Sequence, residues 1–149
     1  MPMTPEPAEL AARFRLVLTP IVRQLRTQVE SDMTPSLMSA LATVSREGLL
    51  PLGDLAAIEK VTPPMATKLA NALEERGLVR RVPCPDDRRV CRLELTTDGR
   101  RLLDRSNTRR NAWLAKRFAA LTDDERASVE GALEVLERLA DEVRRELRR

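Results

Sequence analysis

The fold of this chain is decided by residues 61–103, "VTPPMATKLANALEERGLVRRVPCPDDRRVCRLELTTDGRRLL". A Thr-Pro pair at 62–63 is typical of an N-cap followed by proline at the first helical position, and Gly77 predicts where that helix ends. Aliphatic and β-branched residues then fill 78–83 and 90–95, with turn-forming proline and aspartate between them. The stretch therefore predicts a helix that leads directly into a β-hairpin.

Amphipathic helices are also expected before this stretch. Apolar residues recur every three or four positions over 7–30, and Pro20 is expected to bend the helix that they predict. A second Thr-Pro pair, at 34–35, opens a helix that ends at Gly48, and Pro51 begins a third, short helix. The third helix, a tight turn and the helix of the opening stretch form a helix-turn-helix.

Two long helices are expected after the hairpin. Thr96 caps a helix that runs to about Ala120, and Thr122 with Glu125 forms a capping box at the start of the last helix. The last helix carries a seam at near-heptad spacing, made up of Val129, Leu133, Leu136, Leu139, Val143 and Leu147. We expect a mainly α fold with a small β-hairpin.

The size and composition of the chain favour one globular domain, 1–149. Its 149 residues are enough for one core, and 42% apolar against 33% charged residues is typical of a globular protein. No apolar run approaches the roughly 18 residues of a membrane span, and the first ten residues lack the layout of a secretion signal. We expect a cytoplasmic protein with no membrane partner.

The residues that common catalytic and metal sites need are missing from the sequence. The chain has no histidine, which is the commonest general base, and it has no GKS or GKT phosphate loop and no GxSxG elbow. Two cysteines, Cys84 and Cys91, are too few for a metal-ligand set. We expect no enzyme activity, no cofactor and no metal.

Positive charge is concentrated in one part of a chain whose net charge is only +3. Residues 60–92 hold eight Lys or Arg against four Asp or Glu, an excess typical of a nucleic-acid contact. Arg88 and Arg89 are expected at the hairpin tip, where an arginine can enter a DNA minor groove, and Asp87 is expected to brace the arginine or the turn. The alternative is an ordinary solvated turn.

Several motifs follow one another in an order found in a known family. Within 61–103 the helix is followed by the "ERGLV" exit, the "DRR" tip and the "LTTDG" segment, and "MTPSLMSAL" at 33–41 looks like the start of the family's second helix. In these residues the chain resembles the multiple-antibiotic-resistance regulator (MarR) family of winged helix-turn-helix repressors. The resemblance implies a winged helix-turn-helix DNA-binding region at 33–103 and a helical dimerisation region at 1–32 and 104–149.

The resemblance also implies which side chains meet double-stranded DNA. The residues expected toward the major groove are Thr62, Pro64, Met65, Thr67, Lys68 and Asn71, and those expected in the minor groove are Arg88 and Arg89. Helical periodicity agrees in part, because a core face on this helix turns Met65, Lys68 and Ala72 outward. The expected core face comprises Ala66, Leu69, Ala70 and Leu73.

The expected contacts have a specific chemistry. Lys68 can approach phosphate or guanine, Asn71 suits adenine, and Thr62 as N-cap brings a helix N-terminus with free N–H groups near phosphate. The alternative is that Lys68 and Asn71 are plain surface residues. Met65 and Ala72 depart from the family's usual small hydroxyl residue and arginine, and both departures remove polar contacts.

The first and last helices are expected to join two copies of the chain. Their apolar faces exceed what a small winged domain can cover, and a two-fold dimer would cover them. The dimer would also place two recognition helices roughly 34 Å apart, which suits a palindromic operator. The alternative is a helix bundle within one chain.

The resemblance further implies a cleft between the dimerisation helices and the winged region, where small aromatic or phenolic anions relieve repression. Its candidate lining residues are Arg13, Phe14, Val17, Met38 and Leu41. Arg13 is placed to pair with a carboxylate, or else it is a surface arginine.

The two cysteines have a possible role in the hairpin. If the turn is centred between Asp87 and Arg88, Cys84 and Cys91 lie directly across from one another, which would allow a redox switch. Reduced thiols that pack in the wing are the alternative in a reducing cytoplasm.

These observations predict a homodimeric DNA-binding transcription regulator that represses from a palindromic operator and is released by a small ligand. Two rivals stay open. One is a winged-helix module that binds a protein partner, which Met65 and Ala72 on the exposed face would suit. The other is a constitutive repressor without an effector.

Overall fold

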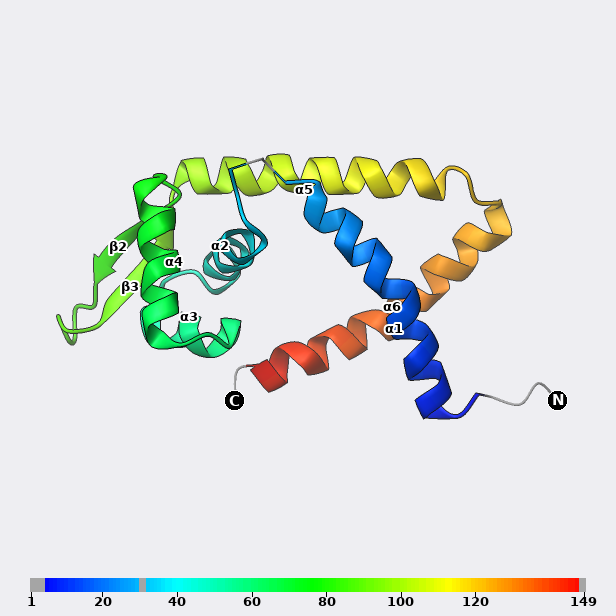
Figure 1. Ribbon diagram of the computed structural model, residues 1–149, viewed down its shortest axis with the longest axis horizontal. Helices are drawn as coiled ribbons and strands as arrows, with labels where there is room; N and C mark the ends of the chain where they lie inside the picture. Colours follow the sequence, from blue (N-terminus) through cyan, green and yellow to red (C-terminus); the bar gives the residue numbers. More distant parts are fainter. Residues whose placement is uncertain (1–4, 30–31, 148–149) are drawn as a thin grey trace.

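The computed structural model describes residues 5–29 and 32–147, which form a mainly helical chain with a small antiparallel sheet (Figure 1). Its elements are α1 (Pro7–Thr27), α2 (Pro35–Glu47), β1 (Leu50–Pro51), α3 (Leu52–Glu59), α4 (Pro63–Glu75), β2 (Val79–Pro83), β3 (Cys91–Leu95), α5 (Thr97–Phe118) and α6 (Asp123–Leu147). The predicted mainly α fold with a hairpin is confirmed. Glu30, at the expected end of the first helix, lies outside the described residues.

The helices begin where the sequence predicts their caps. Thr34, Thr62 and Thr96 each accept, through the side-chain oxygen, the backbone N–H three residues further on, at 3.1 to 3.3 Å. Thr122 and Glu125 form the expected reciprocal capping box, with N–H to oxygen distances of 2.8 and 3.2 Å. These bonds satisfy backbone donors that have no partner inside a helix, so short-range chemistry alone locates the helix starts.

The sheet has a third strand that the sequence analysis did not predict. The strand order is β1-β3-β2, and Leu50 and Pro51 in β1 pair with Leu93 and Arg92 in β3. Pro51 therefore closes a strand, whereas it was expected to open the third helix, which begins one residue later. A strand of two residues has no periodicity that the sequence could show. The strand β1 forms because β3 lies beside it and supplies its hydrogen-bond partners.

The hairpin register differs by one residue from the one expected for the cysteines. Pro83 lies opposite Cys91, and the Cys84 N–H donates to the Val90 carbonyl at 3.1 Å. Cys84 and Cys91 are therefore not directly across from one another, and both are free thiols of intermediate burial. Because the two residues do not form a cross-strand pair, the expected geometry for a redox switch is wrong.

The core lies within the winged helix-turn-helix and draws on α2, α3, α4, the sheet and the first turns of α5. The expected core face of α4 is confirmed, because Ala66, Leu69, Ala70 and Leu73 are all buried. Gly99 shows how closely α5 docks, since a Cβ built there would lie 2.1 Å from the Leu78 carbonyl oxygen. A side chain at position 99 would push α5 off the hairpin, so the "LTTDG" segment needs this glycine.

The terminal helices lie outside that core. In Figure 1 α5 runs away from the winged part along the long axis, and α6 turns back from its far end. No residue of α1 or α6 in the described part is buried. The exposed apolar side chains there include Leu10, Leu16, Val17, Val129, Leu133, Val135, Leu139 and Val143. None of the described helices is long and apolar enough to cross a membrane.

Candidate nucleic-acid interface

The outer side of α4 presents the residues that were expected to face a groove. The exposed members are Thr62, Pro64, Met65, Thr67, Lys68 and Asn71. Met65 retains 44% of its surface, which is a large exposure for an apolar side chain. Ala72 is a correction, because it is half-buried against the core and does not face outward. The exposed face is therefore smaller than periodicity suggested, because it does not include Ala72.

The N-terminus of α4 does not offer the free N–H groups that were expected for a phosphate. Pro63 and Pro64 have no N–H, and the N–H of Met65 already donates to the Thr62 side chain at 3.3 Å. The next N–H, of Ala66, is the first helical bond, at 2.9 Å to the Thr62 carbonyl. The expectation is wrong for residues 63–66, because two prolines, the cap and the first helical bond leave no free N–H there.

Two polar side chains on this face differ in how much of their bonding capacity is used. The Thr67 hydroxyl donates to the Pro63 carbonyl at 3.1 Å, so it has only acceptor capacity left for a groove. Lys68 is exposed and makes no ion pair or hydrogen bond with any residue in the described ranges, so all three ammonium donors are available. Lys68 is therefore the main cation on the exposed face of α4.

Asn71 is held by an arginine of the wing. The Arg81 Nη2 donates to Asn71 Oδ1 at 2.6 Å, and its Nη1 pairs with Glu74 Oε2 at 2.5 Å. Sequence reasoning missed Arg81. The signal was present, because residues 79 and 81 share one face of β2 and Val79 is buried, so Arg81 points toward the protein and needs acceptors there.

The hairpin tip carries two exposed arginines on a braced turn. The Arg89 N–H donates to Asp87 Oδ1 at 2.9 Å, and the Val90 N–H donates to the Asp87 carbonyl at 3.0 Å. Asp87 thus braces the turn backbone, which was one of its two expected roles. Arg88 and Arg89 are exposed at this tip, while Arg80 and Glu94 form an ion pair further down the hairpin. The cations are displayed on a turn that is already ordered.

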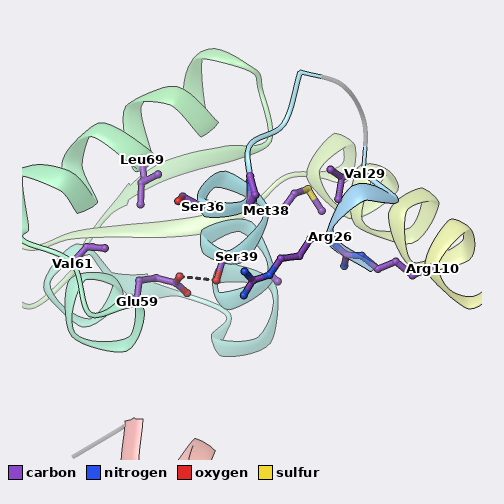
Figure 2. Close-up of a pocket in the computed structure, with 11 residues that line it drawn as sticks. Arg26, Val29, Ser36, Met38, Ser39, Glu59, Val61, Leu69 and Arg110 are labelled. Atoms are coloured by element: carbon purple, nitrogen blue, oxygen red, sulfur yellow. Dashed lines mark hydrogen bonds between the residues drawn. The ribbon is translucent and has the colours of Figure 1, made fainter. Parts of the chain in front are cut away.

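A cavity of about 380 Å³ lies where α1, α2, α3 and α5 approach one another. Its polar lining includes Arg26, Ser39, Glu59 and Arg110, and Figure 2 shows the bond from Ser39 to Glu59. The Glu59 carboxylate accepts from the Ser39 hydroxyl at 2.7 Å and from the Thr43 hydroxyl at 2.5 Å. The Arg110 Nε donates to the Leu25 carbonyl at 3.3 Å, which ties α5 to the end of α1.

Of the five residues expected to line a ligand cleft, only Met38 lines this cavity. Leu41 is wholly buried in the core, and Phe14 lines a separate groove along α1. Arg13 and Val17 are exposed on α1. The arginines at the cavity are Arg26, near the end of α1, and Arg110 of α5.

The chain is similar to known regulators of transcription. The MarR family model matches residues 33–91. An uncharacterised HTH-type transcriptional regulator of Mycobacterium bovis is 35% identical over 136 residues, covering 91% of this chain and 95% of that protein. A putative transcriptional regulator from Pseudomonas aeruginosa has a similar structure, with a TM-score of 0.79, 31% identity and coverage of 93% and 98%.

A third likeness concerns the fold alone. It is to a MepR variant from Staphylococcus aureus bound to an oligodeoxyribonucleotide, with a TM-score of 0.68, 21% identity and coverage of 87% of this chain and 97% of that one.

Proposed function

The chain belongs to the MarR family of DNA-binding transcriptional regulators, and we propose that it is a homodimeric repressor of a palindromic operator. In this proposal α4 enters the major groove, and Arg88 and Arg89 enter the adjacent minor groove. The observation that carries the proposal is the display of Lys68 and the two tip arginines from one rigid core. Members of this family regulate transcription and are not enzymes.

The uncovered apolar faces of the terminal helices support the homodimer. Leu133 and Leu139 of α6 each expose 47% of their surface, which a second copy would cover. The 22 residues of α5 span about 33 Å, comparable to one duplex turn. We assign residues 33–103 to DNA binding, and residues 1–32 and 104–149 to dimerisation.

The cavity beside α2 supports release by a small anion. Arg26 and Arg110 supply positive charge for the carboxylate of an aromatic or phenolic ligand. Val61 and Leu69 also line the cavity, so that an occupant contacts residues immediately before and within α4. A ligand there would bias the position of the recognition helix relative to α1 and α5.

Salt dependence tests the DNA-binding role. Binding to a duplex selected by the purified protein should weaken steeply between low and physiological salt, because phosphate contacts release counterions. The rival module for a protein partner, which the exposed Met65 favours, would bind its partner with little response to salt. Failure to enrich any duplex from a random pool would overturn the proposal.

A melting experiment tests the effector. Aromatic carboxylates that occupy the cavity should raise the melting temperature of the wild type, and an Arg26→Ala, Arg110→Ala double variant should lose the response. If no compound of this class shifts the melting temperature or the affinity for DNA, the constitutive repressor is the correct description.

A further inference from the structure

We propose that Arg81 sets the base preference of Asn71 by holding its side-chain carbonyl, so that only amide N–H groups face the DNA. Arg81 lies in β2 and is a positioning residue, whereas Asn71 on α4 touches the base. The inference rests on the proposed function, because it requires α4 to lie in a major groove.

The guanidinium of Arg81 is clamped between two acceptors on α4. It donates to Asn71 Oδ1 at 2.6 Å and to Glu74 Oε2 at 2.5 Å. Asn71 and Glu74 are three residues apart, so both lie on the same side of the helix, toward the wing. The Arg81 side chain is 32% exposed, so the pair with Glu74 is partly shielded from water. A charge-assisted bond of this kind keeps the second guanidinium nitrogen beside Asn71.

The chemistry of arginine decides which end of the Asn71 amide faces it. A guanidinium has five N–H donors and no acceptor, so the Asn71 atom beside it must be the oxygen. The amide nitrogen is then the end left free, and it carries two donors. The oxygen of Asn71 is engaged before any DNA arrives.

The orientation of the amide changes the base that it matches. Adenine presents an acceptor at N7 and a donor at N6, and an asparagine reads it by using both its oxygen and its nitrogen. Guanine presents two acceptors, N7 and O6, which suit an amide that offers donors only. Asn71 in this structure therefore favours guanine, in place of the adenine that a free asparagine suits.

Selection of bound sequences from a randomised duplex pool tests the inference. The wild-type chain should enrich guanine over adenine at one position in each half-site, and Asn71→Ala should lose that preference. Arg81→Ala frees the amide oxygen, so the same position should shift toward adenine by about tenfold relative to guanine.

Two further variants separate base preference from charge and folding. Arg80→Ala removes the same charge from the neighbouring position, where Arg80 pairs with Glu94 across the hairpin, so the guanine preference should persist. Arg81→Lys keeps the charge, but its single ammonium group should pair with the Glu74 carboxylate and release Asn71. It should therefore shift toward adenine like Arg81→Ala, even if the alanine variant folds poorly.

The outcomes distinguish this inference from the function on which it rests. Retention of guanine in both Arg81 variants, or a profile unchanged by Asn71→Ala, overturns the role of Arg81 while DNA binding stands. A shift in Arg80→Ala equal to that in Arg81→Ala also overturns it, because charge alone would then explain the change. A wild-type chain that enriches no sequence overturns the proposed function itself.

Discussion

The winged part and the terminal helices share the same amphipathic pattern but use it differently. In α4 every residue of the expected apolar face is buried, whereas α1 and α6 bury none of theirs. Apolar periodicity indicates a helix face that is stabilised by burial, but it does not show whether the packing partner belongs to the same chain. In this protein the winged part covers its own apolar faces, whereas the terminal helices expose theirs in the single chain, and the proposed second copy would cover them.

Polar contacts show the same difference. In the winged part they join separate elements, as when Glu59 of α3 accepts from Ser39 and Thr43 of α2. On α6 the bonds of Arg144 to Asp141 and of Ser128 to Asp124 stay within about one turn. Long-range bonds join separate elements of the winged part, whereas the bond that ties α6 to its neighbour lies at its start, where Arg126 Nη1 donates to the Phe118 carbonyl at the end of α5 at 3.3 Å.

The largest expected effect is on the folding of the winged part. Leu73→Ala removes a fully buried side chain and should lower the free energy of unfolding by about 2–5 kcal/mol. Its match is Leu139→Ala on α6, where 47% of the side chain is exposed in the single chain. Denaturant titration at several protein concentrations should show that only the second loss depends on concentration. Equal, concentration-independent losses would remove the distinction between the two regions.

The next effect is on assembly. Leu133→Asp places an unpaired carboxylate in the proposed apolar interface, twice in a symmetric dimer, and should raise the dimer dissociation constant by about 100-fold. Sedimentation measures the dimer, and circular dichroism should show that helix content persists. Glu134→Gln, about 100° around α6 from Leu133 and outside the apolar seam, is the control and should stay dimeric. If Leu133→Asp is as dimeric as the wild type, α6 does not form the interface.

The wing should affect binding without affecting folding. Replacing Arg88 and Arg89 by alanine should weaken operator binding about tenfold and make the salt dependence shallower by about two phosphate contacts. The melting temperature should not change, because both side chains are exposed. Arg138→Ala on α6 removes an exposed cation far along the chain and serves as the control. Unchanged operator binding in the double variant would exclude the tip as a DNA contact.

The smallest expected effect is the loss of stability on removing a helix cap, and it can be compared between α6 and α5. Thr122→Ala removes the capping box of α6 and should cost about 1 kcal/mol, seen as faster amide exchange in the first turns of that helix. Thr96→Ala removes a cap that also bonds Gly77 at 2.6 Å, so its cost should appear in exchange across the winged part. Exchange that rises over the whole chain in both variants would contradict the separation of the two regions.

The sequence by itself determined the features that depend on neighbouring residues. The four threonine caps, the core face of α4 and the hairpin tip at Arg88 and Arg89 were all predictable. Caps, turns and helical periodicity act over three or four residues, so they can be read along the chain. The order of these motifs was enough to indicate the family.

Tertiary structure alone decided the features that depend on distances between remote residues. These are the pairing of β1 with β3, the offset of Cys84 from Cys91, the lining of the cavity by Arg26 and Arg110, and the bond from Arg81 to Asn71. The start of α4 combines both kinds of information. The sequence shows that Pro63 and Pro64 lack an N–H, but only the structure shows that the Met65 N–H is already bonded to the Thr62 side chain. The sequence pattern shows which donors, charges and apolar faces the residues carry. Only the docking of helices and strands decides which partner each of them contacts.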